Sequence, residues 1–173
     1  MTIEYICSRT AHLREKFGTA DPEALCREED VTVLSEPMGT GADACKGFFL
    51  YQSRRKIIVI NSDLDGTVQS FILAHELGHS ILHAEAASLR SFSDFFPYDE
   101  TSRYEYEANL FAAELLLSDE DTLSALSEDD FFTAAKKLRV PPELLDFKLR
   151  ILKHKGYDLN SPISASSCFL KDI

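Results

Sequence analysis

The pentapeptide HELGH at residues 75–79 restricts the fold of this chain more than any other feature, because it requires a helix with two imidazoles on one face. Residues four apart on an α-helix differ by about 40° in direction and about 6 Å in height. The surrounding apolar residues predict that helix over about 67–83, and imidazoles on such a surface need a partner when buried. With five His in 173 residues, chance produces about 0.01 such motifs. Gly78 is unfavourable inside a helix, which predicts either a close packing contact or a direct catalytic need there.

The motif predicts a metal centre. His75 and His79 are placed to bind one Zn²⁺ through ring nitrogens at about 2.0–2.1 Å. Glu76 points beside the metal, where a carboxylate can take a proton from metal-bound water. A catalytic zinc has three protein ligands and one open position. His83 lies on the same stripe, but its rise of about 12 Å from His75 is too large for a shared metal, so we expect a helix-end or pocket residue.

The third ligand is expected from a second helix. A pattern that becomes apolar almost all round predicts this helix over 101–117, and it carries Glu105, Glu107 and Glu114. Spacing favours Glu105 over Glu107, because Asn109 follows Glu105 by one turn and its amide can orient a ligand. The carboxylate that is not a ligand is expected to be a solvated acid near the helix start.

The rest of the chain predicts a mixture of helices and strands. A β-branched run at 31–34 and a hairpin of 47–51 with 56–60 indicate strands. Residues 57–60 are predicted to form an edge strand that holds an extended substrate by β-addition. Shorter helices are expected up to residue 155. Aromatic residues of an irregular segment are expected either to pack on the body or to form a wall over the cleft: Phe92, Phe95, Phe96 and Tyr98.

Charge and composition narrow the possible partners. Lys and Arg number 18 against 29 Asp and Glu, a formal net charge of -11, so direct binding to nucleic acid or to an anionic membrane is disfavoured. No apolar run approaches the roughly 18 residues of a membrane span, and no leader pattern precedes the first helix. These features predict a cytoplasmic protein. The four cysteines are widely spaced and are expected to be buried thiols: Cys7, Cys26, Cys45 and Cys168.

Two sequence blocks, residues 74–83 (AHELGHSILH) and 105–116 (EYEANLFAAELL), together resemble the ImmA/IrrE metallopeptidases. The hairpin with KGFF at 46–49 and IVIN at 58–61 is similar to that family's layout. The resemblance covers residues 45–117 well and the remainder loosely. Many unrelated zinc proteases share the first block, whereas both blocks together are much more specific.

The resemblance implies an α+β, zincin-like fold. Such a fold has a small antiparallel sheet and an active-site helix packed on a largely helical second half. We expect a single zinc metallopeptidase domain over 1–173, with a core at 45–117. A helical C-terminal region at 118–156 and a tail at 157–173 complete it.

The resemblance also implies chemistry and a partner. Zinc is expected on His75, His79 and Glu105, a gluzincin-like ligand set, with Glu76 as the general base. The implied substrate is a helix-turn-helix (XRE-like) repressor, whose cleavage derepresses genes of a mobile element or a stress response. The alternative is a zinc-containing regulatory protein that sequesters the repressor without cleaving it. The sequence leaves the oligomeric state open.

The group that stabilises the transition state is not fixed by the pattern. Three side chains are candidates for holding the developing oxyanion: His83, Tyr104 and Tyr106.

Overall fold

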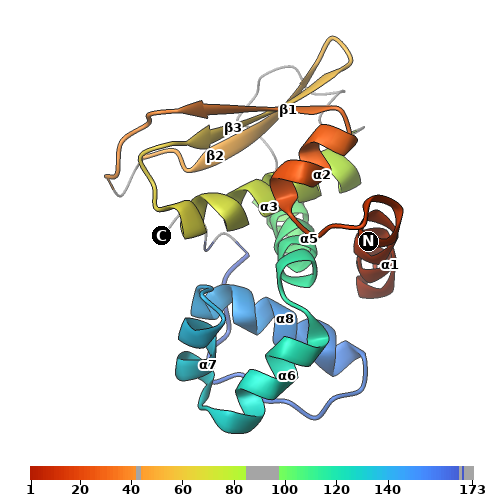
Figure 1. Ribbon diagram of the computed structural model, residues 1–173, viewed down its shortest axis with the longest axis vertical. Coiled ribbons are helices and arrows are strands. Elements are labelled where there is room, and N and C mark those ends of the chain that lie inside the picture. The colour runs from red at the N-terminus through yellow and green to blue at the C-terminus, as the bar shows by residue number, and fades with distance from the viewer. Residues whose placement is uncertain (42–43, 85–97, 168, 170–173) are drawn as a thin grey trace.

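A three-stranded sheet covers one side of an otherwise helical molecule (Figure 1). The computed structural model describes residues 1–41, 44–84, 98–167 and 169. In chain order the described elements are α1 (Ile3–Phe17), α2 (Pro22–Glu28), β1 (Val31–Glu36), β2 (Gly47–Gln52), β3 (Arg55–Asn61), α3 (Gly66–Leu82), α5 (Tyr98–Leu116), α6 (Asp119–Glu128), α7 (Phe131–Lys137) and α8 (Pro142–His154). The predicted α+β class is confirmed.

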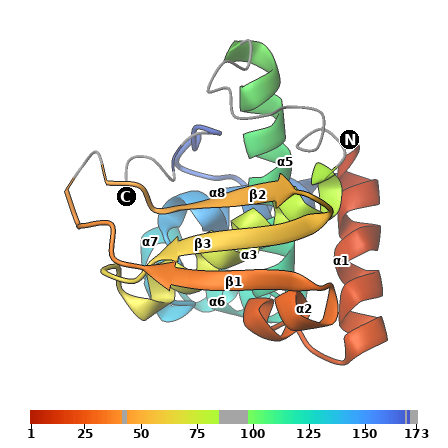
Figure 2. The same cartoon turned by 90° about the horizontal axis from the view of Figure 1, so that it is seen from above.

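The sheet is mixed, with β3 in the middle (Figure 2). The hairpin strands β2 and β3 pair antiparallel, as expected, but β1 pairs parallel with β3. The prediction that residues 57–60 form an edge strand is therefore wrong, because β3 has a partner on each side. A hairpin pattern predicts only its own pairing, and the sequence carries no local signal for the side on which β1 joins.

The β2–β3 turn explains why this hairpin is tight. Ser53 and Arg54 have φ values of 52° and 64°, a left-handed conformation at both central positions. Turns of this geometry match the right-handed twist of paired strands. The predicted four-residue connection is consequently shorter, and Gln52 and Arg55 pair directly.

Helix α3 lies beneath the sheet and carries the HELGH motif (Figure 1). Asp65 caps its first turn by accepting a hydrogen bond from the Thr67 backbone at 2.8 Å. Ile58 and Ile60 of β3 belong to the same buried cluster as Phe71 and Ile72 of α3. The sheet thereby buries one face of α3. His83 is the C-terminal cap of α3, which confirms its predicted place at a helix end.

Helix α5 packs across α3 and begins at Tyr98, three residues before the predicted start. Gly78 explains how closely the two helices approach. A Cβ atom at this position would lie 3.1 Å from Cδ1 and 3.2 Å from Cβ of the fully buried Phe111. The predicted packing contact at Gly78 is confirmed.

A valine at position 78 is expected to destabilise the fold by about 1–3 kcal/mol, because its added atoms overlap the ring of Phe111. Chemical denaturation followed by circular dichroism measures this change. Gly66→Ala is the matched control, since a Cβ at Gly66 of the same helix meets nothing within 4 Å. Equal stability of Gly78→Val and wild type would contradict the close-packing explanation.

Helix α8 joins the C-terminal helices to the rest of the molecule. Leu144, Phe147 and Ile151 enter the cluster that contains α3 and α5. Leu145, Leu149 and Leu152 enter a second cluster formed with α6 and α7. Between them Lys148, fully buried, contacts Glu114 and Asp119, each at 2.6 Å. The single domain over 1–173 stays a prediction, and the shared helix favours it.

Other expectations concern the cysteines and the aromatic residues away from the HELGH motif. Cys26 is buried and Cys7 half-buried, but Cys45 is exposed, so the expectation of four buried thiols is wrong at that position. Cys168, Phe92, Phe95 and Phe96 lie outside the described residues. Among the described helices, none is both long enough and apolar enough to cross a membrane.

Candidate metal centre

Three predicted ligands converge where α3 crosses α5. The Nε2 atoms of His75 and His79 lie 3.0 Å apart. Glu105 places one carboxylate oxygen 3.2 Å from Nε2 of His75 and the other 3.5 Å from Nε2 of His79. His75 is buried, whereas the side chains of His79 and Glu105 retain 15% and 22% exposure. The group is therefore reachable from solvent on one side.

The spacing of these atoms fits a small divalent cation. Ligands at about 2.05 Å from a tetrahedral metal lie roughly 3.3 Å from one another, and the three observed separations are 3.0, 3.2 and 3.5 Å. Two imidazoles and one carboxylate are donors that zinc accepts. Of the residues described, this is the group of His, Cys, Asp and Glu atoms close enough together to hold a metal ion.

Asn109 orients His75 for this role. Its Nδ2 donates to the Ser167 carbonyl at 2.7 Å, which turns Oδ1 toward Nδ1 of His75 at 2.9 Å. An amide oxygen only accepts, so Nδ1 of His75 carries a proton, and in the neutral ring Nε2 has the lone pair that can bind a metal. The amide of Asn109 was expected from the sequence to orient a ligand, because Asn109 follows Glu105 by one helical turn.

Protons and a metal ion compete for the same place. Burial alone raises the pKa of Glu105, but hydrogen bonds from His75 and His79 outweigh it and hold the pKa well below its ordinary value. These bonds require protons on the imidazole atoms that face Glu105. A cation that binds there replaces those protons, so metal uptake and proton release are coupled.

Glu76 lies beside the group in a buried position. Burial raises the pKa of its carboxyl to about 7, and the negative charge of Glu105 acts in the same direction. His79 and a hydrogen bond from the Phe49 backbone act in the opposite direction. A carboxyl whose pKa is near neutrality is suited to accept and return a proton.

Glu107 was expected to be a solvated acid if it was not a ligand, and this expectation is wrong. Its side chain is buried and accepts a hydrogen bond from Nε2 of His83 at 2.9 Å. Nδ1 of His83 lies 3.1 Å from Nδ1 of His79. The spacing of four residues between His79 and His83 places their rings on one face of α3 and is the signal in the sequence for this contact.

The three candidate oxyanion residues point to different places. The ring centroid of Tyr104 lies 4.7 Å from that of His83, near the ligand group. Tyr106 instead packs on Phe147 of α8, with ring centroids 5.6 Å apart. This packing separates Tyr106 from the ligands, and both ring nitrogens of His83 are engaged with Glu107 and His79, which leaves Tyr104 as the candidate near the ligand group.

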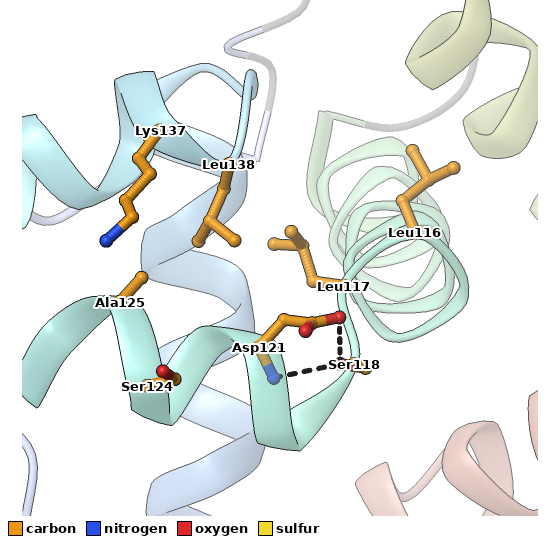
Figure 3. A pocket seen from close by; sticks show the side chains of 8 residues that line it. All are labelled: Leu116, Leu117, Ser118, Asp121, Ser124, Ala125, Lys137 and Leu138. Atoms are coloured by element: carbon orange, nitrogen blue, oxygen red, sulfur yellow. Dashed lines mark hydrogen bonds between the residues drawn. The ribbon is translucent and has the colours of Figure 1, made fainter.

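A separate hollow of about 390 Å³ lies among α6, α7 and the end of α5 (Figure 3). It is lined by Leu116, Leu117, Ser118, Asp121, Ser124, Ala125, Lys137 and Leu138. Ser118 and Asp121 are bonded to each other as the cap of α6. None of the predicted site residues lines this hollow, so it is distinct from the metal centre.

Comparisons with known proteins relate the chain to a metallopeptidase family. Residues 26–150 match the family described as IrrE N-terminal-like domain, Peptidase_M78. A protein of Bacillus phage phi105, "Uncharacterized immunity region protein 2", is 37% identical over 107 residues, which are 62% of this chain and 65% of the phage protein. The match thus spans less than two thirds of that relative. "Metallopeptidase ImmA" of Bacillus subtilis (strain 168) is 28% identical over 137 residues, 76% of each chain.

Proposed function

The chain belongs to the ImmA/IrrE family of metallopeptidases, and on that premise we propose that it is a zinc-dependent endopeptidase with His75, His79 and Glu105 as metal ligands. Glu76 is the general base of this proposal. The observation that carries it is the convergence of three ligand atoms, all within 4.8 Å of one another, beside a buried carboxylate.

Each group of the site has a separate role in the proposed hydrolysis. A zinc ion held by His75, His79 and Glu105 would supply Lewis-acid chemistry, which would make a bound water more acidic and polarise the scissile carbonyl. Glu76 accepts the proton of the attacking water and returns it to the leaving amine. The hydrogen bond from the Phe49 backbone keeps the carboxylate of Glu76 in place between these two transfers. Burial keeps bulk water away from the same carboxylate.

Strand β2 is suited to hold the substrate backbone, since β3 is not an edge. Asn61 donates to the Lys46 carbonyl at 3.0 Å, and bonded pairs alternate along an antiparallel ladder. The backbone groups of Gly47, Phe49 and Tyr51 therefore point away from β3. The bond from Phe49 to Glu76 agrees with this direction and brings the free edge beside the metal centre. An extended peptide can add to such an edge.

Tyr51→Pro tests this placement because it removes an outward N–H and leaves the bonds to β3 intact. We expect kcat/KM for a protein substrate to fall roughly 3- to 10-fold, the value of one hydrogen bond. Leu50→Pro is the control for general damage, because its N–H lies in the ladder and its loss destabilises the sheet. Full activity of a folded Tyr51→Pro protein would contradict substrate binding along β2.

The proposed substrate is a helix-turn-helix repressor, and its cleavage would derepress genes of a mobile element or a stress response. The name of the phage relative places that protein in an immunity region. The net charge of -11 favours a basic partner such as a DNA-binding domain. A repressor acts in the cytoplasm, so the proposal places the peptidase there.

The decisive experiment incubates the purified protein with the repressor encoded beside its gene. Mass spectrometry of the products is expected to show one cut that disappears with a chelator and returns with added zinc. An intact repressor in the presence of a zinc-loaded enzyme would overturn the proposed substrate. Absence of bound metal in the purified and zinc-treated protein would overturn the proposed centre.

A further inference from the structure

A chain of hydrogen bonds runs away from the metal centre on the side opposite Asn109. It starts at Nδ1 of His79, continues through the ring of His83, and ends at Oε2 of Glu107. His83 and Glu107 retain only 6% and 3% exposure, so this relay is shielded from solvent. Arg103, which is largely exposed, contacts the other oxygen of Glu107 at 3.0 Å.

The donor and the acceptor of each hydrogen bond in the relay can be assigned by starting from Glu107, at its end. The side chain of Glu107 faces three donors, which are the amino group of Met1, Nε of Arg103 and Nε2 of His83. A carboxyl group that faces donors on both oxygens accepts from each of them, so Nε2 of His83 donates to Glu107. The ring of His83 is buried and its other nitrogen, Nδ1, faces a second imidazole at 3.1 Å, so the ring has a single proton.

The second ring nitrogen of His83, Nδ1, then determines which nitrogen of His79 carries the proton. Because the one proton of His83 is on Nε2, its Nδ1 is an acceptor. The facing atom, Nδ1 of His79 at 3.1 Å, must donate. With Nδ1 of His79 protonated, the lone pair of a neutral His79 is on Nε2, which faces His75 and Glu105.

We propose that Glu107 and His83 are positioning residues that hold His79 in its metal-binding tautomer, with the proton on Nδ1. This inference rests on the metal centre of the proposed function and adds to it an asymmetry between the two imidazole ligands. His75 is held by a neutral amide, whereas His79 is linked to a buried carboxylate through a second imidazole. Outer partners of this kind raise the basicity of a ligand and fix its ring.

The tautomer can be read directly by ¹⁵N NMR of metal-free protein labelled on histidine. At pH 8 histidines are neutral in general, and Nδ1 of His79 is expected to show the chemical shift of a protonated nitrogen. In Glu107→Met, the acceptor at the end of the relay is lost, and the same signal is expected to move toward the unprotonated range. His83→Leu breaks the relay at its middle and is expected to give the same change.

Two variants separate the relay from general packing at Glu107. Arg103→Gln removes a contact to Glu107 but leaves the path to His79, so its Nδ1 signal is expected to match wild type. Glu107→Gln keeps an acceptor for His83 and is expected to restore the wild-type signal. Zinc competition titrations are expected to give a Kd raised roughly 10- to 100-fold in Glu107→Met and unchanged in Arg103→Gln.

Two results would overturn the relay. One is an unprotonated Nδ1 of His79 in wild type, and the other is an unchanged signal in a folded Glu107→Met or His83→Leu protein. If such a variant loses thermal stability but keeps the tautomer, the role of Glu107 is purely structural. If wild type takes up no zinc, the proposed function fails, while the NMR signals of the metal-free protein still report on the relay.

Discussion

Replacing Glu76 with glutamine is expected to slow peptide hydrolysis by about 10²- to 10⁴-fold and to leave one metal ion bound per chain. Glutamine has nearly the shape of glutamate, but its amide cannot accept the proton of the attacking water. The three ligand atoms belong to His75, His79 and Glu105 and are not altered. Metal content by elemental analysis and cleavage of the repressor, measured on the same preparation, check both halves of this prediction.

Glu120→Gln is a suitable control for the change in charge, since Glu120 is exposed on α6. Cleavage by Glu76→Gln at the wild-type rate would remove Glu76 from the mechanism. A wild-type protein that binds the repressor and one metal ion but leaves the repressor intact would favour the alternative function of sequestration.

The second large effect is expected from Glu105→Ala, which removes the only carboxylate of the three converging groups. The metal then keeps two imidazole ligands, and its Kd is expected to rise by more than the roughly 10- to 100-fold that loss of an outer partner costs. Metal content after dialysis should fall well below one ion per chain, and cleavage should disappear with it. Isothermal titration with zinc measures the change in affinity.

Glu107→Gln is the matched control for this ligand assignment. Glu107 lies two residues away on α5 and carries the same charge, but it is buried and its oxygens face His83 and Arg103. The variant is expected to retain one metal ion per chain. A reversed result, with metal lost from Glu107→Gln and kept by Glu105→Ala, would assign the third ligand to Glu107.

Local patterns in the sequence predicted the elements that carry the site. The spacing of apolar residues gave α3 to within one residue at each end, and Asp21 with Pro22 marks the start of α2 as the capping rules expect. The separation of His75 and His79 determined that their rings meet, because one helix fixes both positions. The preference for Glu105 needed the resemblance as well, since spacing alone left Glu107 open.

Other features depend on contacts between distant segments and have no local signal. The place of β3 between β1 and β2 is decided by where the chain returns after α2, not by the composition of β3. Glu107 looks like a surface acid in sequence, and only the crossing of α3 over α5 buries it beside His83. A pattern of polar and apolar residues cannot predict that a charged side chain is buried, because the burial depends on a specific partner from another helix.

Helix α8 contributes side chains both to the cluster around α3 and α5 and to the cluster formed with α6 and α7. One of its stripes, with Phe147, completes the interior around α3 and α5, and Phe147 contacts Tyr106, the neighbour of Glu105. A fragment that stopped after α5 would leave this interior open to water and Glu114 without its partner Lys148. We therefore expect substitutions on this face of α8 to alter catalysis without approaching the substrate.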